Sequence, residues 1–190
     1  MKKLFLGAAA LILSAAAAAE TYVGAAIGPS NVEANCDLTS SCDKGDTGFK
    51  IYGGYVLPQS PLAGLAVEAG YIDFGKANAT YAFGLVSRST EASALTLNAA
   101  LRLAFTPALH GVGRLGLAYV EGKDSGVNVI GLVQADAKST SKIEPYVGLG
   151  LEYAINKQFK LTGAADFTSY DTGRDSGSAR LLSIGAQYSF

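Results

Sequence analysis

The sequence predicts an all-β protein, an eight-stranded antiparallel up-and-down transmembrane β-barrel preceded by a cleaved signal peptide. Three observations indicate this fold class. Stretches of about ten residues alternate between apolar and polar side chains, as spanning strands do. Long polar segments alternate with short turns along the chain. Charged residues make up only 16% of the sequence, against about 25% in a soluble domain, which indicates that much of the outer surface does not face water.

Residues 1–19 have the pattern of a signal peptide. Lys2 and Lys3 precede an apolar run over 4–13, and Ala17-Ala18-Ala19 offers a small-residue cleavage site. The run is shorter than the ~20 residues of a membrane helix; a retained helix is the alternative. Residues 20–190 then form one barrel domain. Without Lys2 and Lys3, 13 basic residues stand against 16 acidic ones, so nothing predicts a basic patch for nucleic acid.

The first three expected strands run over 21–28, 49–57 and about 65–74. Apolar residues recur there at every second position, as in Val23, Ala25 and Ile27. A long polar loop over 29–46 separates the first two strands. Residues 58–61 form a short turn, because its two prolines cannot serve a sheet ladder. A second long loop is expected over roughly 75–91.

The fourth expected strand, 95–105, has the most regular alternation. Its outer face would carry Leu95, Leu97, Ala99, Leu101, Leu103 and Phe105. An amphipathic helix would repeat apolar residues at i, i+3 and i+4, whereas these recur strictly at i+2. A short turn over 106–111 follows.

The remaining strands are expected over 114–119, 144–153, 159–167 and 180–190. A third long loop is expected over 122–141, a tight turn at Asn156-Lys157 and a last polar loop over 171–178. In the closing strand, apolar side chains fall on one face: Leu182, Ile184, Ala186, Tyr188 and Phe190. The other face is expected to hold small or polar residues, with Leu181 as the exception: Arg180, Ser183, Gly185, Gln187 and Ser189.

Eight antiparallel strands can close on themselves. Closure is required because an open sheet would leave unpaired backbone groups in hydrocarbon. Bacterial barrels have short periplasmic turns and longer external loops, so the long loops are expected outside the cell.

The positions expected to face the lumen carry four cations and four carboxylates: Lys50, Arg102, Arg114, Lys160, Glu68, Glu144, Glu152 and Asp166. Buried charges are costly unless they are paired, and an eight-stranded barrel is narrow enough for side chains to fill. We therefore expect a network of ion pairs that plugs the lumen. A narrow or gated ion path through the same charges is the alternative.

The two cysteines, Cys36 and Cys42, lie in the first long loop. Export takes them to an oxidising compartment, which predicts a local disulfide. Free thiols or a metal site remain alternatives, although the segment offers only Asp37 and Asp43 as further ligands and no histidine. No cofactor site is predicted.

An enzymatic function is not predicted. A Ser–His–acid site needs a base beside its nucleophile, and the only histidine, His110, is expected in a solvated turn on the periplasmic side. Lipid-modifying chemistry at the cell surface would need it at the other end.

Several segments resemble the OmpA-like membrane-spanning barrel family: Gly53-Gly54-Tyr55, Val67-Glu68-Ala69-Gly70-Tyr71 and the closing segment 181–190. The resemblance covers essentially the whole mature chain. It implies an eight-stranded monomer in the outer membrane of a Gram-negative bacterium. It also implies that Glu68 and Asp166 belong to an internal ion-pair gate, with Arg102 or Arg114 as cationic partners. The peptidoglycan-binding domain of larger members is not carried over to this chain.

The expected partners follow from this placement. They are outer-membrane lipid and lipopolysaccharide around the barrel, and the barrel-assembly machinery, for which Tyr188 and Phe190 in the closing strand would form the signal. Three functions are left open. The barrel is structural, it is a surface adhesin or receptor that binds an extracellular ligand through its loops, or it is a low-conductance pore.

Overall fold

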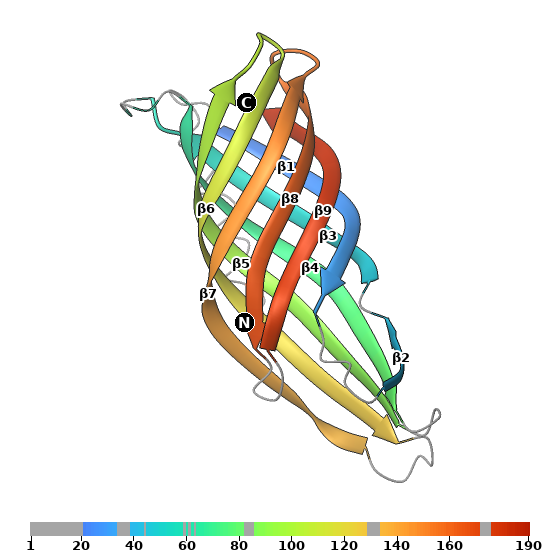
Figure 1. Ribbon diagram of the computed structural model, residues 1–190. Helices are drawn as coiled ribbons and strands as arrows, with labels where there is room; N and C mark the ends of the chain where they lie inside the picture. Colours follow the sequence, from blue (N-terminus) through green and yellow to red (C-terminus); the bar gives the residue numbers. More distant parts are fainter. Residues whose placement is uncertain are drawn as a thin grey trace.

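The protein forms a closed antiparallel β-barrel (Figure 1). A computed structural model describes residues 21–33, 39–43, 45–58, 60, 62, 64–81, 86–128, 134–171 and 176–190. Eight strands form the wall: β1 (Thr21–Val32), β3 (Gly45–Val56), β4 (Leu65–Tyr81), β5 (Val86–Ala104), β6 (Leu109–Asn128), β7 (Gln134–Ala154), β8 (Phe159–Asp171) and β9 (Ser176–Ser189). The described part of the chain has no helix long and apolar enough to cross a membrane.

Each wall strand pairs with its neighbours in the sequence, and the last pairs with the first. β1 and β9 are joined in a register that places Tyr22 opposite Ser189 and Ile27 opposite Ile184. An additional ladder between β4 and β5 completes the circle of wall strands. The predicted up-and-down barrel of eight strands is confirmed.

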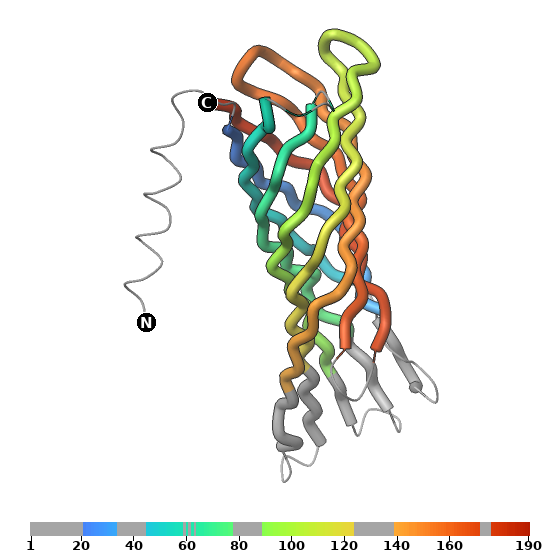
Figure 2. The backbone as a smooth tube through the Cα atoms, turned by 90° about the vertical axis from the view of Figure 1, so that its left-hand side faces the viewer, coloured from blue at the N-terminus to red at the C-terminus, as the bar shows by residue number. Residues whose placement is uncertain are grey.

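The two ends of the barrel differ. One end, the turn end, carries Thr21, Phe190 and the connections 57–64, 105–108 and 155–158. The opposite end, the loop end, is where β1 leads to β3, β4 to β5, β6 to β7 and β8 to β9. Figure 2 shows the turns and the carboxyl terminus together at the top. At the turn end, the amide of Phe190 donates to the carbonyl of Thr21 at 2.9 Å, so the closing strand is tied to the first one up to its final residue.

The strands continue beyond their predicted ends at the loop end. The expected loops 29–46, 75–91, 122–141 and 171–178 each contain strand residues. β1 continues to Val32, β4 to Tyr81 and β6 to Asn128. A short additional strand, β2 (Thr39–Asp43), pairs with the loop end of β4. Polar composition alone suggested loops there, but neighbouring strands supply the backbone partners that polar strands need.

A band of apolar side chains surrounds the barrel. Large outward residues occur on every wall strand and are 37–73% exposed: Val23, Ile27, Ile51, Tyr55, Val67, Leu97, Leu117, Leu149, Leu161 and Ile184 are among them. Side chains so exposed would be unfavourable in water over so large an area, whereas hydrocarbon favours them. The band is the membrane-spanning part of the barrel.

The polarity of the two faces reverses at the loop-end limit of this band. On β5, the outward residues change from Leu95 and Leu97 to the polar Ser93 and Glu91, while Ala92 and Ala94 become the buried inward residues. On β6, Tyr119 is followed outwardly by Glu121, and the inward Val120 is 1% exposed. Beyond the band the wall is therefore built like that of a water-soluble barrel.

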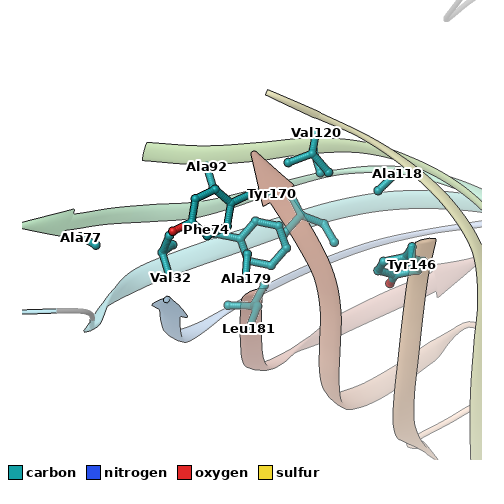
Figure 3. Close-up of a cluster of buried hydrophobic side chains, with 12 residues drawn as sticks. Val32, Phe74, Ala77, Ala92, Ala118, Val120, Tyr146, Tyr170, Ala179 and Leu181 are labelled. Carbon is teal, nitrogen blue, oxygen red and sulfur yellow. The ribbon is translucent and has the colours of Figure 1, made fainter. Parts of the chain in front are cut away.

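An apolar core fills the inside of this outer region. Figure 3 shows its side chains converging from several strands. Its members are Val32, Ile72, Phe74, Ala77, Ala92, Ala94, Ala118, Val120, Tyr146, Tyr170, Ala179 and Leu181. Leu181, the exception in the expected polar face of the closing strand, is buried there. Arg180 was wrongly expected to face inward: it is exposed and pairs with Glu33 at 2.9 Å, because it has the same parity as the outward Leu182.

Candidate functional site

The lumen within the apolar band holds a network of charged side chains, and Glu68 of β4 is at its centre. Its Oε2 accepts hydrogen bonds from Arg114 Nε at 2.6 Å and from Asn98 Nδ2 at 3.2 Å. Its Oε1 accepts from the Tyr22 hydroxyl at 2.6 Å and from Arg102 Nη2 at 3.2 Å. Both carboxylate oxygens are thus saturated with donors from β1, β5 and β6.

A second carboxylate, Glu152 of β7, lies nearer the turn end and shares the same arginines. Arg102 Nε donates to both of its oxygens at 3.2 Å. Lys160 Nζ is 3.5 Å from Oε2, and Arg114 Nη2 is 3.9 Å from Oε1. Because the guanidinium groups contact both glutamates, the two carboxylates and three cations form one connected group.

The third carboxylate, Asp166 of β8, has a different partner. Lys50 Nζ is 2.8 Å from Asp166 Oδ1, and both side chains are almost fully buried. The Tyr146 hydroxyl donates to the same oxygen and accepts from Lys50 at 2.9 Å. Asp166 Oδ2 has no hydrogen-bond partner in the described part of the chain.

Aromatic rings separate and line these groups. The Arg102 guanidinium lies 4.3 Å from the centre of the Tyr22 ring, and the Arg114 guanidinium lies 5.4 Å from that of Tyr52. Inward glycines provide the space: a Cβ at Gly24 would come within 2.3 Å of the Tyr52 ring. A cavity of about 10 Å³ lies among these groups, beside Lys50, Tyr52 and Arg114.

The sequence as a whole matches the family model of the OmpA-like transmembrane domain over residues 16–189. The chain belongs to this family. No curated protein matches it.

Solved outer-membrane barrels resemble this OmpA-like barrel in fold. The attachment invasion locus protein Ail of Yersinia pestis has a TM-score of 0.60 at 17% identity, with 90% of this chain and 99% of Ail covered. Neisserial surface protein A has a TM-score of 0.60 at 15% identity, covering 90% and 97%. A major outer membrane protein from Thermus thermophilus has a TM-score of 0.61 at 14% identity, covering 91% and 100%. At these identities the likeness shows the fold alone.

Seven of the eight charges that the sequence places in the lumen of the OmpA-like barrel meet there. Glu144 does not: it is half-buried near the loop end, and in the described residues no ion pair joins it to the others. Parity correctly puts Glu144 on the inner face, but its position along the axis is beyond the network. Both suggested cations, Arg102 and Arg114, contact Glu68, whereas Asp166 pairs with Lys50.

The sequence did not single out three polar partners of these charges, Tyr22, Asn98 and Tyr146. Each lies at an inward position of its strand and has a recognised charge nearby, either an even number of positions away on the same strand or opposite it on the next. Asn98, for example, is directly opposite Glu68. Their polar character at inward positions could therefore have identified them as partners of the lumen charges.

His110 lies in β6, not in the expected turn. It is half-buried on the inner face at the turn end, opposite Ala104 and Glu152 in the two neighbouring ladders. Its Nδ1 is buried without a hydrogen-bond partner among the described residues. The strand begins at Leu109, which accounts for the difference.

Two other predicted features stay predictions. Cys36 lies outside the described residues, so the disulfide to Cys42 is not visible; the backbone of Cys42 is in β2. At the carboxyl terminus, the Tyr188 ring is 5.0 Å from that of Phe159 and 5.1 Å from that of Phe190. Phe159 and Phe190 are exposed at the turn end and Tyr188 is half-buried. A role of Tyr188 and Phe190 in assembly is a proposal.

Exposed ion pairs surround the loop end. Lys76 Nζ is 2.8 Å from Glu91, and Lys142 Nζ is 2.5 Å from Asp171. Hydrogen bonds to these carboxylates raise the pKa of both lysines. A raised lysine pKa stabilises the fold below the unfolded-state value, and the contribution is lost as the pH rises through the folded value. Because the lysines are exposed, solvent keeps it small. In the described residues no group of three metal-ligating side chains forms.

Proposed function

We propose that the protein is a structural outer-membrane barrel with a closed lumen that directs its loop end to the outside of the cell. The observation that supports closure most is the filling of the lumen at two successive levels. The charge network occupies the membrane-spanning part, and the apolar core with Ile72, Phe74 and Leu181 occupies the part beyond it. An ion path needs continuous water, and the cavity of about 10 Å³ beside Lys50 and Arg114 has room for about one molecule.

Planar-bilayer recording tests the closed lumen. The folded protein is reconstituted after its faster gel migration without boiling has verified a closed barrel. We expect no current steps from the wild type. Steps that change when Arg102→Met or Glu68→Gln neutralises a lumen charge, and that do not change with Arg180→Met outside the lumen, would instead establish the low-conductance pore.

A second candidate function is surface binding by the loop end. β4, β5, β6 and β7 have 17, 19, 20 and 21 residues, whereas a tilted spanning strand needs about 9–11. The segments 86–94, 120–128 and 134–142 therefore extend beyond the band by about 30 Å along each strand. The apolar core supports them as a rigid scaffold, and binding residues are frequently found on loops held by such scaffolds.

The structural relatives favour this candidate. Ail is named as an attachment invasion locus protein, and one of its structures contains the heparin analogue sucrose octasulfate. Neisserial surface protein A is named for the cell surface. By analogy, we propose that the loop end of the present barrel contacts extracellular ligands, and that the segment with Cys36 and Cys42 contributes.

Loop deletion distinguishes surface binding from a purely structural role. Cells that display the barrel are compared with cells that display a variant lacking 34–42, in attachment to host cells or immobilised matrix. A deletion of 172–175 is the matched control. Lost attachment by the first variant, while both variants keep their heat-dependent gel shift, establishes binding through that segment. Equal attachment by all three proteins would refute it.

The proposal includes no catalytic activity. His110, the only histidine of the sequence, is on the inner face at the turn end, opposite Glu152. A hydrolase of surface lipid would need its base at the loop end. Incubation of the folded barrel with lipopolysaccharide and phospholipid vesicles should therefore leave the acyl-chain composition unchanged.

A further inference from the structure

The ion-paired charges of the lumen do not balance. In the described part of the chain, these charges form two groups: the balanced pair of Lys50 and Asp166, and a connected group of three cations and two carboxylates, which are Arg102, Arg114, Lys160, Glu68 and Glu152. Glu144, the carboxylate that would have equalised the count, lies apart from it. One positive charge is therefore in excess in the connected group, whose members other than Lys160 have side chains that are 1–8% exposed. An uncompensated buried charge is unfavourable.

The cavity of about 10 Å³ lies next to this excess. Its polar lining consists of Lys50, Tyr52, Arg114, Glu152, Thr162 and Ser183. All of these except Glu152 carry N–H or O–H groups that can donate. The oxygens of Glu152 are turned to Arg102 at 3.2 Å and to Lys160 at 3.5 Å, so nearby cations offset its charge.

Ser183 supplies an independent sign that the lining binds a ligand. Its side chain is 2% exposed, and its hydroxyl has no hydrogen-bond partner in the described residues. Buried hydroxyls are nearly always bonded. Lys50 also has a donor to spare, since its ammonium has three hydrogens and gives two of them to Asp166 and Tyr146.

We infer that the cavity binds one monovalent anion of halide size, held by Lys50, Arg114 and the hydroxyl of Ser183. The anion accepts hydrogen bonds from the free donors and also compensates the excess charge. A water molecule would accept the hydrogen bonds but would leave the charge uncompensated. Lys160, whose side chain is 13% exposed, connects the network to the turn end and marks the route of entry. The site does not depend on whether the loop end binds a ligand.

Bromide tests the site directly. Crystals of the detergent-solubilised barrel are grown or soaked in sodium bromide, and diffraction is measured at the bromine absorption edge. We expect an anomalous peak between Lys50, Arg114 and Ser183. Ordinary density without an anomalous signal would identify water and overturn the inference, as would an empty cavity.

Salt-dependent unfolding tests the same site in solution. The urea midpoint is measured by gel mobility in sodium chloride and in equal concentrations of sodium gluconate, whose anion is too large for the cavity. An anion that binds only the folded state raises the midpoint as its concentration increases. We expect the wild type to unfold at higher urea in chloride, with a midpoint that rises over each tenfold increase in concentration.

Three variants separate the site from a general salt effect. Lys160→Gln leaves three cations against three carboxylates, and Ser183→Ala removes the free hydroxyl; both should lose the difference between the two salts. Ser189→Ala is the matched control, because the Ser189 hydroxyl is also buried without a partner in the described chain but does not line the cavity. It should keep the wild-type difference. Equal midpoints of the wild type in both salts, or the same chloride effect in all four proteins, would overturn the inference.

Discussion

Replacement of Glu68 by glutamine gives the sharpest test of the charge network. The side chains have the same shape, but the variant loses the carboxylate charge and exchanges one acceptor oxygen for an NH₂ donor. Oε2 accepts from Arg114 and Asn98, and Oε1 accepts from Tyr22, Arg102 and Arg114. Whichever oxygen is replaced, at least two donors then face another donor.

The expected loss of stability is large because all the partners are buried. Glu68 and Arg114 have side chains that are 2% and 3% exposed, so water cannot replace the lost acceptor. Removing one partner of a buried ion pair costs about 3–5 kcal/mol. With a urea slope of about 1–3 kcal/mol per molar for small proteins, the unfolding midpoint of Glu68→Gln should fall by at least about 1 M.

The assay is urea unfolding in detergent micelles, with the folded fraction read from gel mobility without boiling. The chain contains no tryptophan, so circular dichroism serves as the second probe. Glu91→Gln is the matched control: Glu91 pairs with Lys76 at the same kind of distance, 2.8 Å, but both side chains are well exposed. That variant should lose less than about 1 kcal/mol. A Glu68→Gln midpoint within error of the wild type, or equal losses in both variants, would show that the network does not stabilise the fold.

Three further perturbations test the packing, the membrane limit and the outer core. A Cβ at Gly185 would lie 2.0 Å from the Ala25 carbonyl oxygen, so Gly185→Ala should cost about 1–3 kcal/mol in the same urea assay. A Cβ at Gly113 would have nothing within 4 Å, so Gly113→Ala should cost less than about 0.5 kcal/mol. Equal costs would contradict the register of β9 and β1. Leu97→Lys, inside the apolar band, should reduce the free energy of folding into bilayers by about 2–4 kcal/mol. Ser93→Lys, beyond the band, should reduce it by less than about 0.5 kcal/mol. Equal losses would contradict the proposed limit of the membrane. Phe74→Ala removes a ring that is 0% exposed and should cost about 3–5 kcal/mol; a wild-type midpoint would show that the outer core does not stabilise the barrel.

Strand alternation predicted the barrel and the facing of residues in its membrane-spanning part. Leu97 and Leu117 face outward and Arg102 and Arg114 inward, as expected, because parity along a strand depends only on local sequence. The same parity placed Glu144 with the lumen charges, where it does not belong. Which charges meet depends on strand register and tilt, since these set the height of each residue along the barrel axis.

The loop-end segments were harder to predict from the sequence than the membrane-spanning ones. Their alternation continues, but the apolar residues change from the outer face to the inner face. Phe74, Val120 and Leu181 face inward, although apolar residues were expected to face outward. Each lies an odd number of positions from an outward apolar residue of its strand, as Val120 does from Tyr119 and Leu181 from Leu182. A change of parity in a single strand looks like the end of that strand. Only when neighbouring strands are assembled do these residues form a shared interior.

The sequence by itself therefore determined the membrane-spanning strand segments, the antiparallel order and the outward face within the membrane. Each follows from local periodicity and from the need to pair every backbone group in hydrocarbon. The tertiary structure decided the partners of each buried charge, the excess of one cation among the ion-paired charges of the lumen and the apolar core beyond the band. These are set by which side chains from distant strands reach the same height, and no local pattern contains that information.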